Sequence, residues 1–306
     1  KSFYVLLSLF LFTGLALKIY LNERPFEPRE RDYALVGSFY VFAMWLGFGV
    51  YAVYEMVKEK LAAKIAAPLV IGLSLLAAPM LMAYQNWDDH DRSGKHTALA
   101  MAKQYLDSCE PNAILFTIGD NDTFPLWYAQ EIEEYRTDVK IVNTSLLMTD
   151  WYIDQMKMKT YNSDGLPISF THNQYVGDKR DGIVFDNRTE NRWYLKNFLE
   201  FAKSEDTTTQ VEMESGIKLH FFPTNKVRLL IDKNHIIKNK VVSAKYNDSI
   251  VPFIDMDISG GALYKNRLIM LDILQNNNWK RPIYFSGGAF ADDDYLWMKD
   301  YLQLDG

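Results

Sequence analysis

The hydrophobic pattern divides the chain into an apolar first part and a mixed remainder. Because a helix rises about 1.5 Å per residue, an uncharged run of about 20 residues can cross a hydrocarbon core of roughly 30 Å. Three such runs in succession favour membrane spans over buried core helices. The uncharged runs are Ser2–Leu17, Tyr33–Tyr54 and Ile65–Trp87, of 16, 22 and 23 residues. They predict three transmembrane helices, at about 2–20, 33–55 and 65–87, in a transmembrane region 1–87.

Residues 88–306 have the composition of a globular domain. They carry a net charge of −8, whereas residues 1–87 carry +2. Their number is ample for a core of their own, and the acidic balance argues against a nucleic-acid partner. The single cysteine, Cys109, excludes an internal disulfide. Because the chain opens on Lys1 rather than Met and shows no closing element, we expect it to be truncated at both ends.

The first part of this domain alternates between strand and helix patterns. The apolar runs Ala113–Ile118 and Val139–Val142 predict buried strands. Helices are expected at Gly94–Ser108, Thr123–Tyr135 and Thr149–Lys159. Short connections in a β-α-β-α order are typical of a parallel sheet with crossover helices. The predicted fold class is therefore a mixed α/β domain with a partly parallel, Rossmann-like sheet.

Shorter elements are expected in the rest of the domain. The middle, Tyr161–Arg188, is rich in Asn, Asp, Gly and Thr, which predicts loops with a short hairpin. The remaining predicted elements are a helix at Glu190–Lys203, antiparallel strands at Lys218–Phe222, Val227–Asp232 and Val241–Lys245, a helix at Leu263–Gln275, a turn at Asn276–Lys280, a strand at Pro282–Phe285 and a helix at Asp293–Leu302.

Three polar loops after predicted strands form the main candidate site. Ligands of open α/β sheets gather at the carboxyl ends of parallel strands, where carboxylates and amides can bind sugar hydroxyls or a cation. The competing interpretation is that Asp122 or Thr123 only caps the next helix. Aromatic side chains nearby suit a sugar ring or core packing. The candidate substrate-binding residues are Asp120, Asn121, Asp122, Thr123, Trp127, Asn143, Asp150, Trp151 and Ser286, in or beside the loops Gly119–Thr123, Asn143–Ser145 and Ser286–Gly288.

A second polar cluster, Asp88–Arg92, lies where the third span leaves the membrane. Adjacent residues rarely all point at one ion, and no zinc-type cysteine spacing exists, so we predict no metal site. A solvated linker is the alternative to a binding role. The loop Asn22–Asp32 emerges on the same side of the membrane, and we expect charge pairing between the two segments. The candidate residues of this region are Arg29, Arg31, Asp89, His90, Asp91 and Arg92.

Charge does not fix which side of the membrane carries the large domain. The positive-inside rule counts Lys and Arg in short loops. The two loops between the spans balance at three cations each, Arg24, Arg29 and Arg31 against Lys58, Lys60 and Lys64.

Five longer motifs extend over nearly the whole chain. They are Glu23–Tyr33 (ERPFEPRERDY), Asp89–Gly94, Gly119–Tyr128 (GDNDTFPLWY), Thr149–Tyr152 and Asn278–Phe285. Together they resemble a family of large Bacteroidetes membrane proteins that was long labelled only as a domain of unknown function. That family is similar to protein O-mannosyltransferases, which are multi-spanning GT-C glycosyltransferases with a lipid-phosphate-linked sugar donor.

This resemblance implies a function for a longer protein, of which this chain is the C-terminal part. In the GT-C class an acidic residue of the first external loop is the base, which would place catalysis upstream of Lys1. The class also implies a multi-pass bacterial inner-membrane protein with a periplasmic large domain. The implied partners are membrane lipid and an acceptor protein or glycan, with no cofactor besides the sugar donor.

Two roles remain open for the residues of this chain. In the transferase, the large domain binds or positions the acceptor, and Arg29 and Arg31 lie near the donor phosphate. The alternative is a non-catalytic, membrane-anchored periplasmic domain that binds glycans or partner proteins. A transporter is disfavoured, because the spans contain no charged residue and no broken helix pair.

Overall fold

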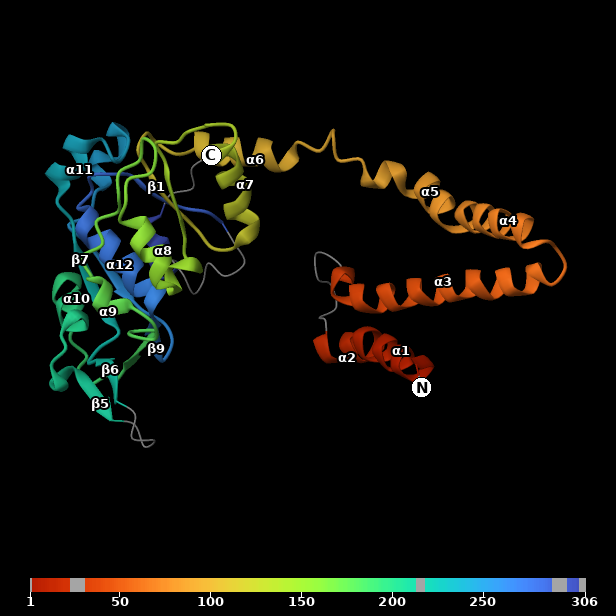
Figure 1. The fold of residues 1–306 in the computed structure, drawn as a ribbon. Helices are drawn as coiled ribbons and strands as arrows, with labels where there is room; N and C mark the ends of the chain where they lie inside the picture. Colours follow the sequence, from red (N-terminus) through yellow and green to blue (C-terminus); the bar gives the residue numbers. More distant parts are fainter. Residues whose placement is uncertain (1, 23–30, 213–217, 288–295, 303–306) are drawn as a thin grey trace. The chain divides into compact units, whose positions relative to one another are not determined.

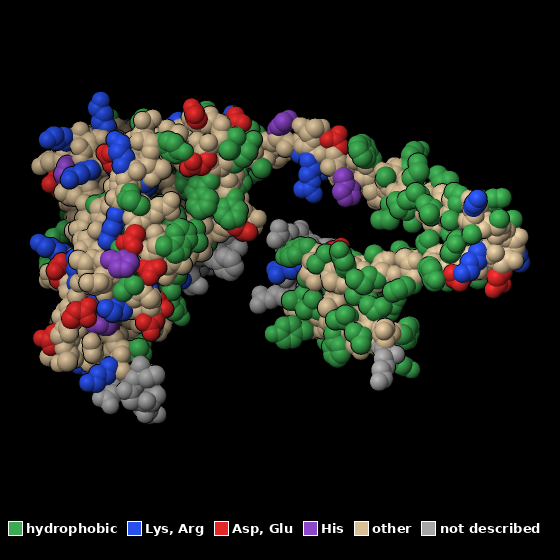
Figure 2. All heavy atoms as spheres, viewed as in Figure 1, with side chains coloured by type: hydrophobic (Ala, Val, Ile, Leu, Met, Phe, Trp, Pro, Cys, Tyr) green, Lys and Arg blue, Asp and Glu red, His purple; other side chains and the backbone are tan. Residues whose placement is uncertain are grey.

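The computed structural model describes residues 2–22, 31–212, 218–287 and 296–302. The chain divides into two compact units, Lys1–Gly94 and Lys95–Gly306 (Figure 1). The first unit contains three apolar helical segments of 20, 27 and 28 residues, each long enough to cross a membrane. Hydrophobic side chains cover most of their surface (Figure 2). The three predicted apolar helices are confirmed, at Ser2–Leu21, Asp32–Lys58 and Ala63–His90.

Two of the three segments contain a turn of π-helix. In the third segment this wider turn includes Pro79, whose ring and missing N–H are incompatible with a regular α-helical bond. The segments are built from α1 (Ser2–Leu11), π turn η1 (Phe12–Ala16) and α2 (Leu17–Leu21); 3₁₀ turn η2 (Asp32–Leu35) and α3 (Val36–Lys58); and α4 (Ala63–Leu75), π turn η3 (Leu76–Met80) and α5 (Leu81–His90).

Small residues let the first two segments approach each other closely. A Cβ atom added at Gly14 would lie 3.1 Å from Ser38 Cβ, and one added at Gly37 would lie 3.1 Å from Thr13 Cβ. Close backbone approach at small residues is a usual basis of helix association in lipid, where no hydrophobic force drives it. The first unit therefore has a specific helix–helix contact.

The second unit contains a parallel three-stranded sheet in the order β10-β1-β2. The central strand β1 (Ile114–Thr117) is buried at all four positions, because it is paired on both sides and covered on both faces. Its partners are β2 (Lys140–Asn143) and β10 (Ile283–Phe285), both parallel to it. The predicted fold class, three apolar helices followed by a mixed α/β domain with a partly parallel sheet, is confirmed.

Helices cover both faces of this sheet. Alternate side chains of a strand point to opposite faces. Leu115 of β1 packs on one face in a cluster with Leu106 and Leu126, which come from the helices α6 and α7. Phe116 of β1 belongs to the larger core on the other face. The covering helices are α6 (Thr97–Asp107) and α7 (Asp120–Glu131) on the first face, and α8 (Asp150–Met156) and α12 (Lys265–Asn277) contribute to the core on the second.

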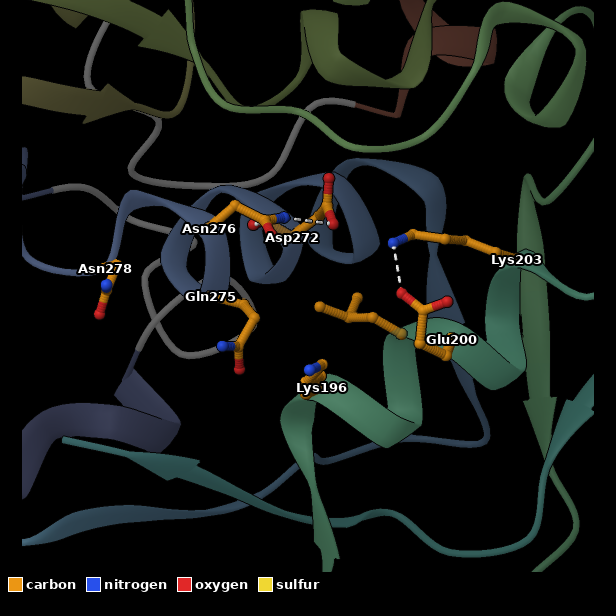
Figure 3. A pocket seen from close by; sticks show the side chains of 8 residues that line it. Lys196, Glu200, Lys203, Asp272, Gln275, Asn276 and Asn278 are labelled. Atoms are coloured by element: carbon orange, nitrogen blue, oxygen red, sulfur yellow. Dashed lines mark hydrogen bonds and ion pairs between the residues drawn. The ribbon is translucent and has the colours of Figure 1, made fainter. Parts of the chain in front are cut away.

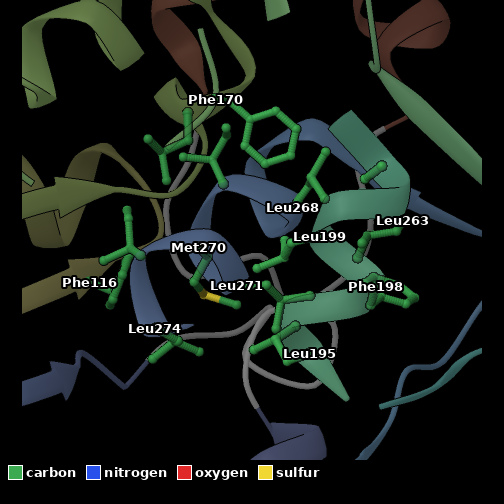
Figure 4. Close-up of a cluster of buried hydrophobic side chains, with 14 of the residues drawn as sticks. Phe116, Phe170, Leu195, Phe198, Leu199, Leu263, Leu268, Met270, Leu271 and Leu274 are labelled. Atoms are coloured by element: carbon green, nitrogen blue, oxygen red, sulfur yellow. The ribbon is translucent and has the colours of Figure 1, made fainter. Parts of the chain in front are cut away.

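Helix α12 lies at the centre of the larger core. All seven residues of Leu268–Leu274 are buried, so the helix is covered on every side. In Figure 4, Leu195 and Leu199 of α10 (Leu195–Lys203) lie along Leu271 of α12. One consequence is that a charged side chain of α12 must find its partner inside the protein.

Two further sheets belong to the unit, a four-stranded one with the order β5-β6-β3-β9 and a three-stranded one with the order β4-β7-β8. Their strands are β3 (Gly182–Phe185), β4 (Trp193–Tyr194), β5 (Gln210–Glu212), β6 (Lys218–Phe222), β7 (Lys226–Leu230), β8 (Phe253–Asp257) and β9 (Ala262–Tyr264). The remaining helical elements are η4 (Leu146–Met148), α9 (His172–Tyr175), η5 (Thr207–Thr209), α11 (Lys233–Asn239), η6 (Ala244–Ser249) and η7 (Leu296–Tyr301).

Several predictions for this second half are wrong. Val241–Lys245 is not a strand, because Lys240, directly after α11, takes the left-handed conformation and the 3₁₀ turn η6 follows. No hairpin forms within Tyr161–Arg188, all of which the structure describes; β3 instead pairs with the distant strands β6 and β9. The strands predicted at Lys218–Phe222 and Val227–Asp232 exist, but they belong to different sheets.

Other boundaries are shifted. The helix predicted from Thr123 begins at Asp120, so Pro125 lies beyond its first turn. The first residues of the helix predicted at Glu190–Lys203 are extended and include β4. The last predicted helix, Asp293–Leu302, is a 3₁₀ helix where the structure describes it, and residues 293–295 lie outside the described part.

Candidate functional site

The start of α7 is organised by the carboxylate of Asp122. Its Oδ2 accepts a hydrogen bond of 2.9 Å from the Ile118 N–H, and its Oδ1 accepts one of 2.9 Å from the Gly119 N–H. These contacts satisfy backbone donors at the turn into the helix, as in a capping box. The geometry fits the interpretation of Asp122 as a helix-capping residue.

Asn143, at the carboxyl end of β2, contacts the same turn. Its Nδ2 donates to Thr123 Oγ1 at 2.8 Å, and the Thr123 hydroxyl lies 2.7 Å from that of Thr117. Its Oδ1 accepts from the Leu146 N–H at 2.9 Å. Thr123 is fully buried and Asn143 is 3% exposed. Both side chains therefore act inside the fold, where they join two strand ends.

The third predicted loop, after β10, joins the same cluster. The Ser286 hydroxyl donates to Asp122 Oδ2 at 2.6 Å, and Ser145 Oγ donates to the Ile118 carbonyl at 2.5 Å. The three loops predicted to share one strand edge do lie together. Gly288 lies outside the described residues.

Few polar groups of this cluster point to solvent. Asp120 and Asn121 are exposed, and within the part of the chain that the structure describes Asp120 Oδ1 accepts a hydrogen bond only from the neighbouring Asn121 N–H. Among the described residues, the buried Thr144 hydroxyl has no hydrogen-bond partner, and no group of three or more His, Cys, Asp or Glu side chains is placed to hold a metal ion. Ligand chemistry at this edge therefore depends on Asp120 and Asn121.

The two tryptophans of the predicted site meet at a different place. Trp127 of α7 and Trp151 of α8 both line a cleft of about 290 Å³ at the open edge of β2, which we call the α7–α8 cleft. Trp127 also stacks on Phe124 with ring centroids 5.5 Å apart. The other residues that line the cleft include Gln130, Lys140, Ile141, Tyr152, Gln155, Thr160 and Tyr161.

A buried lysine borders the α7–α8 cleft. Lys140 is 3% exposed, and its Nζ donates to the Met158 carbonyl at 2.9 Å and to Thr160 Oγ1 at 3.0 Å. Burial, with a smaller contribution from the nearby Arg281 guanidinium, lowers the pKa of Lys140 to about 8. The sequence signal for this residue is a single lysine inside the apolar run Val139–Val142, which sequence reasoning passed over.

Asp150 stands apart from the three loops. Its Oδ2 accepts the Gly177 N–H at 3.2 Å and its Oδ1 accepts the Trp151 N–H at 2.7 Å. These backbone hydrogen bonds, that from Gly177 first, lower the pKa of the Asp150 carboxyl. Its position at the start of α8 indicates a role in holding the loop before β3.

A further cavity of about 370 Å³ lies between α10 and α12, outside the predicted site (Figure 3). At its wall Asp272, fully buried, accepts the Ser169 N–H at 2.6 Å and the Asn276 Nδ2 at 2.8 Å. Burial raises the pKa of the Asp272 carboxyl. Opposite, Lys203 Nζ lies 2.9 Å from Glu200 Oε1. Asp272, Glu200 and Lys203 at this cavity thus each have a hydrogen-bond or ion-pair partner.

His90 and Asp91, near the end of the third apolar segment, form hydrogen bonds with residues close by in the sequence. His90 ends α5 and its Nδ1 lies 2.8 Å from the Asn86 carbonyl. Asp91 accepts two hydrogen bonds from Ser93, which lower the pKa of its carboxyl. Asp89 and Arg92 are exposed. Arg29 lies outside the described residues, so the charge pairing expected between Arg29 or Arg31 and Asp88–Arg92 stays a prediction.

The fold defines a class of protein: three apolar helices that indicate a multi-pass membrane protein, and a mixed α/β domain that follows them. The family described as TMEM260-associated domain 2 matches residues 98–306, and the chain belongs to this family. The match covers the resemblance motifs from Gly119 onward and says nothing of the taxon. No curated protein and no solved structure matches the chain.

Proposed function

We propose that this chain is the C-terminal part of a GT-C type membrane glycosyltransferase that uses a lipid-linked sugar donor. The observation that carries the proposal is the family match over residues 98–306, because TMEM260 is a membrane protein related to O-mannosyltransferases. The three apolar helices are consistent with an enzyme that meets a lipid-linked donor in the bilayer.

In this proposal the α/β domain binds or positions the acceptor protein, and catalysis belongs to a segment before Lys1. The protein lies in a bacterial inner membrane with the domain in the periplasm, and Arg29 and Arg31 lie near the donor phosphate. Exposed Asp120 and Asn121 are the groups of the strand-end cluster that can meet an acceptor.

The test is an intact-mass measurement of exported proteins. Deletion of the gene should remove a hexose-sized mass from them, and the full-length gene should restore it. Asp120→Asn should reduce the modification with the protein present at normal level, since within the described residues the Asp120 carboxylate hydrogen-bonds only to its neighbour. Asn121→Asp, which adds a charge at the same turn, is the matched variant. Unchanged masses after deletion would refute the transferase.

A non-catalytic binding domain for glycans or partner proteins is the second candidate. The observation that favours it is the set of hydrogen bonds at the strand ends, which pair Asp122 with Ser286 and Thr123 with Asn143. These bonds leave few polar groups there for catalysis. Unchanged masses after deletion, together with retained binding of the full chain to exported proteins, would select this candidate.

A further inference from the structure

Strand β2 is an edge strand, and half of its backbone groups point away from the sheet. The Lys140 N–H donates to the Ala113 carbonyl of the β1 side at 2.8 Å. The N–H and C=O of one strand residue point the same way in a parallel ladder, and the direction alternates along the strand. The odd-numbered residues of β2 and its flanks therefore present their backbone groups to the open edge.

Two of these residues are already occupied by side chains. The Val139 carbonyl accepts from Gln130 Nε2 at 2.9 Å, and the Asn143 N–H donates to the Tyr152 hydroxyl at 2.9 Å. Ile141 lies between them. Within the part of the chain that the structure describes, neither its N–H nor its C=O has a hydrogen-bond partner, although the residue is only 4% exposed.

Ile141 lines the α7–α8 cleft, so this unmade pair of hydrogen bonds faces a cavity. A buried backbone donor and acceptor without partners are costly, and native proteins rarely leave both unpaired. In antiparallel pairing, the complement of one strand residue is one residue of another extended chain, which offers an acceptor and a donor at the same spacing. The cleft is therefore shaped for a short extended peptide.

The lining of the cleft favours a peptide over a sugar. Gln130 Nε2 donates hydrogen bonds to the Arg136 and Val139 carbonyls. Lys140 Nζ donates one to Thr160, and the Tyr161 hydroxyl donates one to Glu131. A hexose carries several hydroxyls that need partners, and most polar groups here are already engaged. An apolar side chain needs none.

We propose that the α7–α8 cleft binds one extended residue of a polypeptide, whose N–H and C=O pair with the C=O and N–H of Ile141 and whose apolar side chain packs beside Trp127. Side chains of directly paired residues lie on the same face of a sheet. The Ile141 side chain packs in the cluster that includes Trp127. That this polypeptide is the acceptor protein follows only from the proposed function. The peptide site itself does not depend on that function.

The first test uses a fluorescein-labelled Thr-Val-Phe-Val-Thr peptide and the full chain in lipid nanodiscs, with Kd from fluorescence anisotropy. We expect saturable binding. Methylation of the Phe nitrogen removes the donor for the Ile141 carbonyl and should raise Kd about five-fold. Replacement of Phe by Ser should raise Kd at least about ten-fold. No saturable binding, or equal affinity of the methylated peptide, would overturn the proposal.

Two variants locate the site. Gln155→Trp fills the cleft and should abolish binding, whereas Gln275→Trp, in the cavity between α10 and α12, should leave Kd unchanged. Displacement of the peptide by free mannose would assign the cleft to a glycan, and self-association lost in Gln155→Trp would assign the edge to a second copy; either result overturns the proposal. If peptide binding fails while gene deletion still removes the hexose mass, only this inference falls.

Discussion

The hydroxyl of Ser286 donates a hydrogen bond of 2.6 Å to Asp122 Oδ2, although 164 residues separate the two along the chain. The same carboxylate accepts the Gly119 N–H. One side chain therefore joins the turn between β1 and α7 to the end of β10, the strand that pairs with β1. This arrangement explains why Asp122 and Ser286 lie together at the strand ends with their polar groups engaged by each other.

A double-mutant cycle on this pair should show strong coupling. Ser286→Ala should lower the free energy of unfolding by about 1 kcal/mol and Asp122→Ala by about 2 kcal/mol, since Asp122 also caps the helix. With both changes the loss should be about 1 kcal/mol less than the sum. The measurement is denaturant unfolding of the full chain in micelles. Asp120→Ala is the control, with a change below about 0.5 kcal/mol, and additive losses would contradict the finding.

Lys140 should give the protein a recognisable pH dependence. Burial lowers its pKa from 10.5 in the unfolded chain to about 8 in the fold. Between these values the unfolded state binds more protons, so stability rises with pH in this window, and the full penalty applies below about pH 8. Lys140→Met lacks this titration. The stability of the wild type relative to Lys140→Met should therefore rise by on the order of 3 kcal/mol from about pH 7 to about pH 11.

Comparison of unfolding curves over this pH range checks the Lys140 prediction. Lys196→Met is the matched control, because Lys196 is exposed and the difference from wild type should stay flat. A flat difference for Lys140→Met as well would show that the Lys140 ammonium is solvated in the folded protein.

The sequence predicted the elements whose signal is local. The apolar runs around Ile114 and Ile141, bounded by turn residues, predicted β1 and β2. Because ligands gather at the carboxyl ends of parallel strands, the sequence also predicted that Asp122, Asn143 and Ser286 lie near one another, and their hydrogen bonds show that they do. For these three residues the prediction concerned position. Their chemical role depends on which hydrogen bonds they make. The sequence does not distinguish an aspartate that caps a helix from one that binds a ligand.

The parts that could not be predicted depend on distant partners. β3 pairs with β6 and β9, which follow it by tens of residues, so no local hairpin signal existed. The run Val241–Lys245 has strand-like composition but follows a helix end at Lys240 and finds no strand partner. The α7–α8 cleft was invisible for the same reason, because Trp127, Ile141 and Trp151 meet only once the helices lie on either side of β2.

A larger residue at Gly37 should weaken the contact between the first two apolar segments. Its Cβ would meet Thr13 Cβ at 3.1 Å, so Gly37→Ile should lower the thermal unfolding midpoint of the chain in nanodiscs by several degrees. Gly49→Ile in the same helix α3 is the matched control, because nothing lies within 4 Å of its added Cβ. Equal midpoints of the two variants would argue against a specific contact at Gly37.

Replacement of the buried Arg281 should destabilise the α/β domain. Arg281 is 7% exposed, and its guanidinium donates to the carbonyls of Asn112 at 2.7 Å and Asp164 at 3.0 Å, and to Ser163 Oγ at 2.9 Å. It thereby connects the segment just before β10 with the loop that precedes β1 and with the loop that follows α8. A lysine cannot reproduce this planar fork, and it leaves buried carbonyls unpaired.

Arg281→Lys should therefore cost about 3 kcal/mol or more in the free energy of unfolding, because several acceptors lose their donor at about 1–3 kcal/mol each. Arg188→Lys is the matched control. Arg188 is exposed and pairs with Asp186 two residues away, so its change should stay below about 0.5 kcal/mol. Denaturant unfolding of both variants decides the matter. Similar small losses would mean that water satisfies the Asn112 and Asp164 carbonyls as well as the guanidinium does.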